Sequence, residues 1–445
     1  MIFKRKLYDK LLVWKQQTAG TKALLIEGAR RIGKSTLVEE FAKNEYRSYL
    51  MIDFNKVSDS VISAFNNYMN DLDTFFLILS SEYGVRLYPK ESIIIFDEIQ
   101  QFPKARQAIK YLVADGRFDY IETGSLISIK ENVNDITIPS EERTLLMYPM
   151  DFEEFAWAMN EEPLMAYIRQ CFDKKVPLEQ GIHAKAMLLF RQYMIVGGMP
   201  KSLSAYLENN RSFEMADMEK RDILTLYRND IKKIKSGYRS SVLSIFDQIP
   251  AFLSRSERRV VMNRIEKGAS FPKYHDTFFW LSDSMIANEC FNCSDPNVGL
   301  SLNEDRTYVK CYMGDTGLLI SHTFDENEIS DGELYREILL GKLSVNEGMF
   351  YENVIAQMLV AAGHKLYFYT RYNQEKHRND MEIDFILSNH SKLRYKIFPI
   401  EVKSNDKYSI RSLTRFNESF RQRIGGSYVI HPKNLSVKAV SYTHL

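Results

Sequence analysis

The sequence predicts an α/β protein whose first part is a parallel sheet with flanking helices. Three short apolar runs, each ending in polar or charged residues, lead to this prediction: "KALLIEG", "SIIIFDEIQ" and "FDYIETGSL", at 22–28, 92–100 and 118–126. Near-continuous apolar runs of this length are typical of strands buried on both faces of a parallel sheet. The carboxyl ends of such strands meet at one edge, where α/β proteins collect ligands, so we expect the polar residues to lie together there.

The first run leads into a loop with the spacing of a phosphate-binding loop. Gly28 and Gly33 bracket four residues, and Lys34 and Ser35 follow at once, which matches G-x-x-x-x-G-K-[ST]. Glycine lets the backbone amides approach a triphosphate, and the helical pattern "STLVEEFAKN" that follows points its positive end at the anion. A chance match is the alternative, but the strand before the loop and the helix after it favour a nucleotide site. We therefore predict that ATP is bound by Gly28, Ala29, Arg30, Arg31, Ile32, Gly33, Lys34, Ser35 and Thr36.

Two acids at the end of the second run complete the predicted site. Lys34 is expected to reach the β and γ phosphates, while the Ser35 hydroxyl and the Asp97 carboxylate hold Mg²⁺. Glu98, one residue further, is placed to act as the general base on the attacking water. The alternative is an acidic cap for the next helix.

The third run ends in Thr123, Gly124 and Ser125. A polar side chain here could sense the γ-phosphate between the other two strands, and Thr123 is the first candidate for that catalytic role, with Ser125 second. A helix cap is the other interpretation.

The composition excludes several classes of protein. With 445 residues the chain is too long for one core, and 45% hydrophobic and 26% charged residues indicate an ordinary globular protein. The net charge of +1 means that any nucleic-acid surface must be a local patch. No apolar run is long enough to cross a membrane and the N-terminus has no secretory core, so we expect a cytoplasmic protein. Of the four cysteines only Cys290 and Cys293 form a C-x-x-C pair, which favours buried thiols over a zinc site.

Several segments of the chain resemble a known group of proteins. The segments "LLIEGARRIGKSTLVEEFA", "IIIFDEIQ", "IETGS" and "YPMDFEEF" are similar to the bacterial and archaeal AAA-like P-loop ATPases that carry a DUF4143 domain. "YMIVGGMP", "LYRNDI" and "CYMGDTGLL" resemble further motifs of that group. Arg30 matches the group's arginine in the loop, whereas Arg31 does not. In that group a glycine-arginine pair usually precedes the segment that corresponds to "YPMDFEEF"; here Arg143 keeps the arginine, and Glu142 replaces the glycine. Arg143 could contact a phosphate as an arginine finger does, or it could pair with a neighbouring acid.

Pattern and resemblance together predict three domains. An AAA-like ATPase domain is expected over 1–160, a helical, winged-helix-like middle region over 161–335, and a DUF4143-type domain over 336–445. The middle region should place helices from Ser240 to Glu289, with "TFFWLSDSMI" as the third. Its two basic stretches could neutralise a DNA backbone or form solvated helix faces. They are Lys220, Arg221, Arg228, Lys232, Lys233, Lys235 and Arg239, then Arg255, Arg258, Arg259, Arg264 and Lys267.

The last third reads as an amphipathic helix over 346–363 followed by strands over 365–372, 381–388 and 396–404. Glu401 and Lys403 are two apart on a strand, so both side chains point to one face. Asp384 at the end of the preceding strand and Glu352 on the helix could join them. The three acids would hold a divalent cation, and the lysine would steady the attacking hydroxide or a phosphate oxygen.

This order of residues resembles the restriction-endonuclease-like PD-(D/E)xK fold, with Ile383 in place of the proline. The resemblance implies a nuclease site formed by Glu352, Asp384, Glu401 and Lys403, although E-x-K on a strand is also frequent by chance. In the first functional hypothesis, ATP hydrolysis drives or gates this nuclease-like domain on DNA. In the alternative, the protein is a nucleotide-dependent switch whose C-terminal domain binds a protein partner without cleaving nucleic acid. A homo-oligomer is a further expectation from the AAA-like resemblance.

Overall fold

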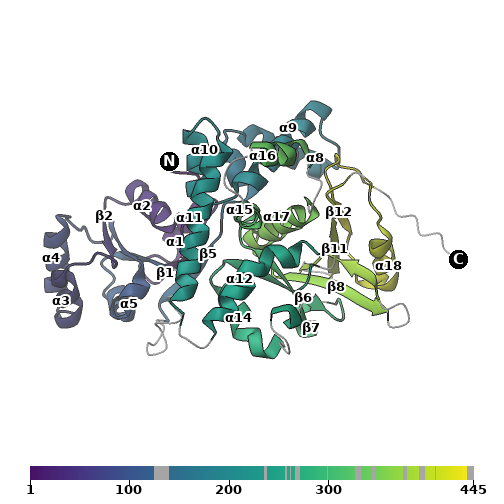
Figure 1. Cartoon of the computed structure of the whole chain (residues 1–445). Helices are drawn as coiled ribbons and strands as arrows, with labels where there is room; N and C mark the ends of the chain where they lie inside the picture. Colours follow the sequence, from purple (N-terminus) through teal and green to yellow (C-terminus); the bar gives the residue numbers. More distant parts are fainter. Residues whose placement is uncertain are drawn as a thin grey trace. The chain divides into compact units, whose positions relative to one another are not determined.

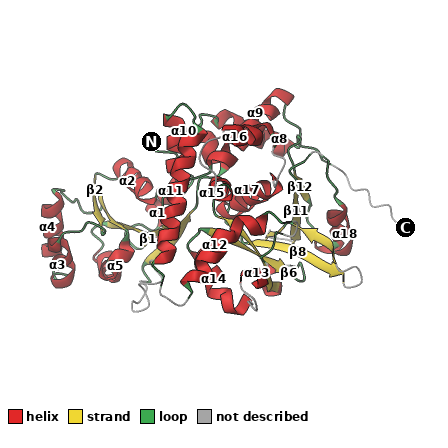
Figure 2. Ribbon diagram, in the orientation of Figure 1, coloured by secondary structure: helices red, strands yellow, loops and turns green. Residues whose placement is uncertain are grey.

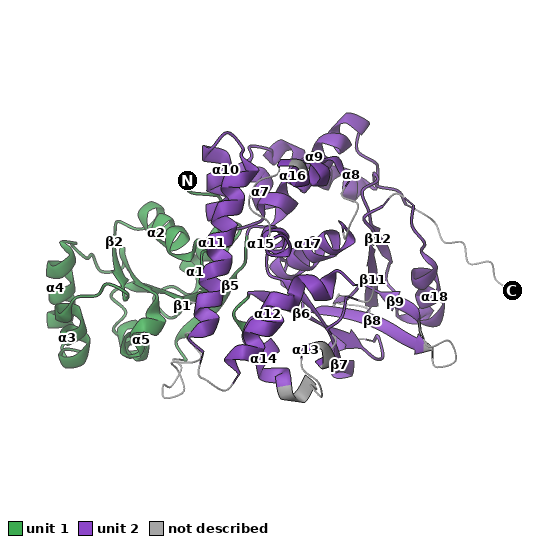
Figure 3. Ribbon diagram, in the orientation of Figure 1, with its two compact units in different colours: residues 1–149, 283–285 green, residues 150–282, 286–445 purple. Residues whose placement is uncertain are grey.

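A computed structural model describes most of the chain as two compact units. Unit 1 comprises Met1–Pro149 with Asp283–Met285, and unit 2 comprises Met150–Ser282 with Ile286–Leu445 (Figure 3). The described residues are 1–124, 140–234, 238–255, 258–260, 262–265, 271–297, 299–325, 332–342, 347–373, 378–389, 396–405 and 407–437.

Unit 1 is built on a five-stranded parallel sheet in the order β2-β3-β4-β1-β5. Its strands are β1 (Ala23–Gly28), β2 (Ser48–Asp53), β3 (Ser92–Asp97), β4 (Asp119–Gly124) and β5 (Glu142–Met147). The three predicted strands are confirmed as β1, β3 and β4, and every residue of β3 is buried. Because β4 lies between β1 and β3, its carboxyl end lies between the loop after β1 and the acids after β3.

Helices cover both faces of this sheet (Figure 1). An apolar cluster joins one face to α3 (Asp59–Asn67), α4 (Leu72–Tyr83) and α5 (Pro103–Asp115). Its aromatic centre is formed by Phe54, Phe65, Phe75 and Phe96, whose rings meet mostly edge to face. Helices α1 (Leu7–Gln17) and α2 (Lys34–Glu45) pack against each other, with Tyr8 edge-on to Phe41. The strand ends are thus held by a rigid framework.

The first part of unit 2 is helical, as the sequence predicts (Figure 2). The helices of this part are α7 (Phe152–Ala158), α8 (Glu162–Lys174), α9 (Gln180–Val196), α10 (Pro200–Glu208), α11 (Phe213–Lys232), α12 (Arg239–Leu253), α13 (Met262–Ile265) and α14 (Phe271–Asp283). Two further helices, α15 (Thr316–Thr323) and α16 (Gly332–Leu340), lie later in the chain, after two strands. The expected run of helices to Glu289 ends earlier, because a strand begins at Ala287.

The second part of unit 2 contains two sheets. One has the order β7-β6-β8-β9, formed by β6 (Ala287–Cys293), β7 (Glu304–Met313), β8 (Leu366–Asn373) and β9 (Arg378–Ile383). The other has the order β10-β11-β12, formed by β10 (Phe385–Asn389), β11 (Lys396–Val402) and β12 (Tyr428–Ile430). Since β6 pairs with β8, the regions 161–335 and 336–445 share a sheet and fold as one unit, where the sequence predicts two domains.

Two predicted elements of the C-terminal region differ in the structure. The strand expected over 381–388 breaks at Asp384, because β9 pairs with β8 while β10 pairs with β11. The helix α17 (Glu347–Ala361) is not amphipathic over its first half, since every residue from Met349 to Gln357 is buried. Helix α18 (Arg411–Ser419) follows β11.

Candidate functional site

The loop between β1 and α2 depends on its two glycines. Gly33 has a left-handed backbone with φ 90°, directly before the helix begins at Lys34. A Cβ on Gly28 would lie 2.4 Å from the Met147 carbonyl oxygen, so only glycine fits against β5. Arg31 also has a positive φ of 67°. The predicted strand-loop-helix context of the phosphate-binding pattern is therefore present.

Lys34 is buried at the centre of this loop. Its ammonium donates hydrogen bonds to the carbonyl oxygens of Gly28 at 2.9 Å and Ala29 at 2.8 Å. Burial lowers the pKa of Lys34 to about 8, an effect that the nearby Glu98 and Asp97 carboxylates partly offset. The hydrogen bonds of this buried ammonium go to neutral carbonyl oxygens. A triphosphate could replace them with charge-assisted hydrogen bonds, which are stronger.

The two hydroxyls and the first acid of the predicted site lie in contact. The Ser35 hydroxyl donates to the Asp97 carboxylate at 2.7 Å, and the Thr123 hydroxyl donates to the same carboxylate oxygen. The Glu98 amide donates to the Thr123 hydroxyl at 3.3 Å. Residues from the ends of β3 and β4 and the start of α2 therefore meet at one point, and the hydroxyl and carboxylate oxygens there are ligands of the kind that Mg²⁺ prefers.

Glu98 is held in an unusual backbone conformation beside this cluster. Its φ is 54°, in the left-handed region that a residue with a Cβ rarely adopts. It precedes the short 3₁₀ turn Ile99–Gln101 without capping it, and α5 has Phe102 at its N-cap, so the structure does not use Glu98 as a helix cap. The buried Gln100 side chain donates to the Glu98 carboxylate, a partner that the sequence pattern did not reveal.

The remaining loop residues differ in exposure. Ala29 and Ile32 are buried, Arg30 is half-buried, and Arg31 and Thr36 are exposed. Ser125 lies outside the described residues.

Arg143 lies on β5, in register with Leu24 of β1, four residues before Gly28. At about 3.3 Å per residue this is roughly 13 Å from the loop. Its neighbour Glu142 forms a two-point ion pair with Arg106, at 2.7 Å and 3.0 Å. The carboxylate of Glu142 is therefore engaged by Arg106 and not by Arg143.

The C-terminal region contains a polar cavity of about 330 Å³ in unit 2. Three of the predicted residues line it, namely Glu352 on α17, Asp384 between β9 and β10, and Lys403 after β11. Glu382 of β9, two residues before Asp384, lines it as well and was not predicted. The remaining lining residues are Arg258, Gly348, Val402, Ser404, Asn405, Lys407, Tyr408 and Ser412.

The carboxylates around this cavity are already paired with cations. The buried Lys310 ammonium lies 3.3 Å from Glu352, 3.1 Å from Glu382 and 3.9 Å from Asp384. The Arg258 guanidinium contacts Glu352 from another side, and the Tyr312 hydroxyl donates to it. Lys310 and Arg258 were not predicted members of this site, because a lysine between apolar residues, as in "YVKCYM", is the usual pattern of an outward-facing side chain on a strand.

Glu401 does not line the cavity. Its carboxylate lies 2.9 Å from the Lys403 ammonium, one residue beyond the end of β11 at Val402, so the two side chains are close as the sequence predicts. The carboxylate is buried, with the residue 2% exposed. Burial raises the pKa of Glu401, Lys403 lowers it, and the negative charge of Asp384 adds to the increase. Among the described residues, no group of three or more His, Cys, Asp or Glu side chains is arranged to hold a metal ion.

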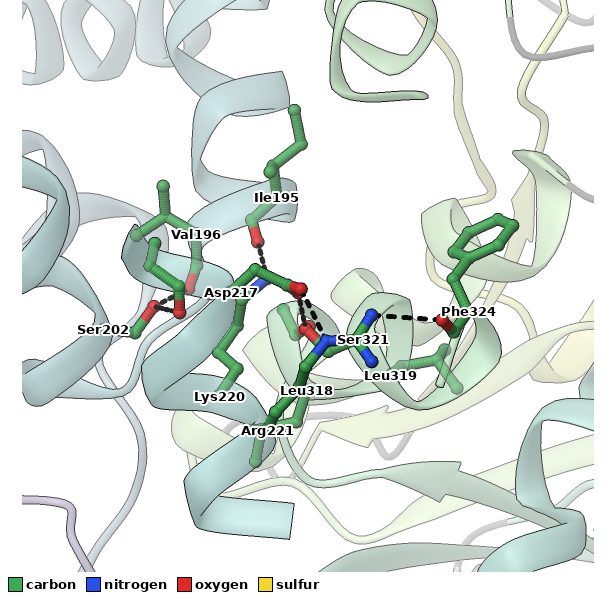
Figure 4. Close-up of polar contacts among 12 residues, drawn as sticks. Ile195, Val196, Ser202, Asp217, Lys220, Arg221, Leu318, Leu319, Ser321 and Phe324 are labelled. Carbon is green, nitrogen blue, oxygen red and sulfur yellow. Dashed lines mark hydrogen bonds and ion pairs between the residues drawn. The ribbon is translucent and has the colours of Figure 1, made fainter. Parts of the chain in front are cut away.

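Lys220 and Arg221 of the first basic stretch form contacts within unit 2 (Figure 4). Lys220 is fully buried and donates to the Ile195 carbonyl at 2.7 Å, with the Asp217 carboxylate 3.6 Å away. Arg221 bonds Asp217 at 2.7 Å and the Phe324 carbonyl at 3.1 Å. Arg228 bonds Asp247 and Asp325. These residues join α11 to α9, α12 and the segment at the end of α15.

Of the second basic stretch, Arg258 lines the cavity and the Arg259 guanidinium lies 5.1 Å from the ring centre of Tyr308. Lys235 and Lys267 lie outside the described residues, as does the side chain of Arg264. All four cysteines are buried free thiols. No helix among the residues described is long and apolar enough to cross a membrane.

Comparison with protein families assigns three segments of the chain. A family described as an AAA domain matches residues 20–156, a domain of unknown function (DUF8612) matches 187–328, and a domain of unknown function (DUF4143) matches 347–444. The first and third of these matches support an AAA-like P-loop ATPase. A comparison with curated protein sequences found no match.

Solved structures with similar chains have low identity. A closed-state Hsp104 complex with ATPγS and casein is 13% identical, with 64% of this chain and 50% of that chain covered and a TM-score of 0.29. The present chain thus spans about half the length of that relative. The RuvB Holliday junction branch migration motor of Thermotoga maritima is 11% identical, with coverages of 66% and 90% and a TM-score of 0.27. AMPPCP-bound DnaA from Aquifex aeolicus is 11% identical, with coverages of 64% and 90% and a TM-score of 0.26. All three TM-scores lie below 0.5.

Proposed function

Since the N-terminal unit contains an AAA-like P-loop ATPase domain, we propose that it binds ATP with Mg²⁺ and hydrolyses it. The observation that carries this proposal is the contact among Ser35, Asp97 and Thr123 beside the buried Lys34 ammonium. In other P-loop proteins the serine hydroxyl and the acid at the end of a buried strand hold Mg²⁺.

The residues of this site would each contribute one part of the reaction. Lys34 would exchange its bonds to the Gly28 and Ala29 carbonyls for the β and γ phosphates. Ser35 and Asp97 would hold the metal ion, which neutralises charge that develops on the phosphates. Glu98, turned by its left-handed backbone and held by Gln100, would orient and deprotonate the attacking water. Thr123 would fix Asp97 and the Glu98 amide relative to each other.

Phosphate release from ATP, measured with Mg²⁺ and then with EDTA, tests this proposal. We expect turnover with Mg²⁺ and its loss when the metal is chelated. Equal release under both conditions would contradict the assignment.

For the C-terminal region we propose a binding role controlled by the nucleotide state. Lys310 and Arg258 already balance the carboxylates of the cavity, and Glu401 is paired with Lys403, so a nuclease metal site would require these contacts to break. A folded, charge-balanced cavity instead fits a polar ligand or a charged segment of a protein partner. Homo-oligomerisation and a cytoplasmic location are further proposals that follow from the AAA-like domain.

A nuclease gated by ATP hydrolysis is the second candidate function. The observation in its favour is that Glu352, Asp384 and Lys403, which come from three separate segments of the chain, line one cavity. Incubation of DNA with the protein and Mg²⁺ tests this candidate, with Asp384→Ala and Lys403→Ala as variants. Cleavage that both variants abolish, without a change in ATP turnover, would establish the nuclease, and absence of cleavage by the parent would favour the binding role.

The effect of duplex DNA on ATP turnover distinguishes a DNA partner from a protein partner. If DNA is the partner, it should raise ATP turnover at low salt and lose this effect as salt increases, because phosphate contacts release counterions. No stimulation at low salt would favour a protein partner.

A further inference from the structure

Arg5 links the phosphate-binding loop to the chain that follows β5. It lies just before α1 and is 7% exposed. One guanidinium nitrogen donates to the Ile32 carbonyl at 3.0 Å, and another donates to the Tyr148 carbonyl at 2.6 Å. Thus a residue from the N-terminal segment holds the backbone of the loop directly before Gly33 and Lys34.

The bond to Ile32 fixes the orientation of the next amide. In a trans peptide the C=O and the N–H that share one plane point in opposite directions. A carbonyl of Ile32 that faces Arg5 therefore directs the Gly33 N–H away from Arg5. Backbone N–H groups directed to one side are what lets such a loop cradle a phosphate.

The loop needs such an external support because its own backbone is unusual. Arg31 and Gly33, on either side of Ile32, both have positive φ, at 67° and 90°. A residue with a Cβ in the left-handed region persists only where the surrounding structure holds it there. Ile32 is itself fully buried, so the guanidinium and the apolar packing act on the same peptide.

The second bond gives the support a fixed anchor. Met147, directly before Tyr148, pairs in register with Gly28 at the end of β1. The Tyr148 carbonyl therefore belongs to the sheet framework at the base of the loop. Arg5 joins that framework to the part of the loop that carries the Gly33 amide.

We propose that Arg5 is a positioning residue for ATP binding, which keeps the Gly33 amide directed at the phosphates through its bond to the Ile32 carbonyl. This inference rests on the proposed ATPase function. It concerns the phosphates and not the base, so the effect of Arg5 should appear equally with a ligand that has no nucleoside.

The experiment compares Arg5→Gln and Arg5→Lys with the parent. Affinity is measured by displacement of a fluorescent ATP analogue, with ATP and with inorganic tripolyphosphate as competitors, and ATP turnover is measured in parallel. Arg117→Gln is the matched control, because Arg117 is also an arginine of unit 1 but bonds the side chains of Asp73 and Asp115. Thermal unfolding and far-UV circular dichroism show which variants are folded, and Arg5→Lys decides the question if Arg5→Gln does not fold.

We expect Arg5→Gln to weaken both competitors about tenfold, which corresponds to about 1.4 kcal/mol. Arg5→Lys should fall between it and the parent, since a lysine can keep one of the two bonds. The KM for ATP should rise while kcat stays within about twofold, because the amide holds substrate and transition state alike. Folded Arg5 variants that bind both competitors as tightly as the parent and Arg117→Gln would overturn the inference alone. A parent that binds neither competitor would instead overturn the proposed function on which it rests.

Discussion

Ser35 and Asp97 are 62 positions apart in the sequence, yet the serine hydroxyl donates a hydrogen bond to the aspartate carboxylate at 2.7 Å. This contact brings together the two side chains that the account assigns to Mg²⁺. Asp97→Asn should therefore raise the Mg²⁺ concentration needed for half-maximal ATP turnover by at least about tenfold, since a lost charge–metal contact is worth more than about 1.4 kcal/mol.

Asp53→Asn is the control for this measurement. Asp53 ends β2 in register with Asp97, so it is a carboxylate at the same edge of the same sheet, one strand away. It accepts hydrogen bonds from Asn55 and not from the loop. An equal change in the Mg²⁺ requirement of both variants would contradict the specific role of Asp97.

The lowered pKa of Lys34 predicts how nucleotide affinity depends on pH. In the free protein burial holds this pKa at about 8, and phosphates would raise it on binding. Below pH 8 the ammonium is already charged and affinity should be flat. Above pH 8 binding requires the uptake of one proton, so the Kd should rise about tenfold per pH unit. Isothermal titration in buffers of different ionisation heat would measure the proton uptake, and a Kd that stays constant from pH 8 to 9.5 would contradict this assignment.

The buried Glu122 carboxyl of β4 predicts that the stability of the fold depends on pH. Glu122 of β4 is completely buried, and burial followed by the charge of Glu142 raises its pKa well above the usual value, against the opposing effect of Arg106. Glu27 adds to the increase. Because the folded pKa is raised, the stabilisation is complete below the unfolded pKa of about 4.3 and is lost as pH rises through the folded pKa.

Glu122→Gln removes this titration while keeping the shape of the side chain. We expect the variant to be more stable than the parent near pH 8 by about 1.4 kcal/mol for each pKa unit of the increase, and to lose that advantage near pH 4. Thermal unfolding across this range measures the difference. A variant that is less stable than the parent at pH 8 would show that Glu122 is ionised and paired in the folded protein.

The C-terminal cavity predicts a large cost for the loss of Lys310. Its ammonium is buried among Glu352, Glu382 and Asp384, so Lys310→Met leaves these carboxylates with less compensation. Breaking a buried ion pair by removal of one partner costs about 3–5 kcal/mol. Lys365→Met is the control, because Lys365 is 55% exposed in its ion pair with Glu304 and its loss should cost below about 1 kcal/mol. Similar unfolding temperatures for both variants would argue against a structural role for the buried lysine.

The ATP site could be predicted from the sequence because each of its parts is a local pattern. The loop pattern from Gly28 to Ser35 and the apolar run before Asp97 are both readable without their neighbours. Strand β5 is harder to recognise, since as the sheet edge it carries exposed residues such as Thr144 and Leu146. Arg5 has no sequence signal that separates it from Lys4 and Lys6, because only the folded loop gives it the Ile32 carbonyl as a partner.

The C-terminal cavity was predicted in part, because its members come from distant strands. Lys310 reaches the acids through the pairing of β6 with β7 and β8, which no local pattern reveals. Asp384 breaks the expected strand because its carboxylate accepts the Val402 amide at 2.8 Å, where the chain passes from one sheet to the other.

Nucleotide binding and ATP turnover of the parent, Lys34→Ala and Glu98→Gln, measured under the same conditions, test the assignment of this ATP site most directly. We predict that Lys34→Ala binds ATP at least about 100-fold more weakly, since it loses a buried charge-assisted contact of about 3 kcal/mol. We also predict that Glu98→Gln binds ATP as the parent does but hydrolyses it about 100-fold or more slowly, because only the general base is removed. Turnover by Glu98→Gln at the parent's rate, or unchanged ATP binding by Lys34→Ala, would contradict the assignment of this site.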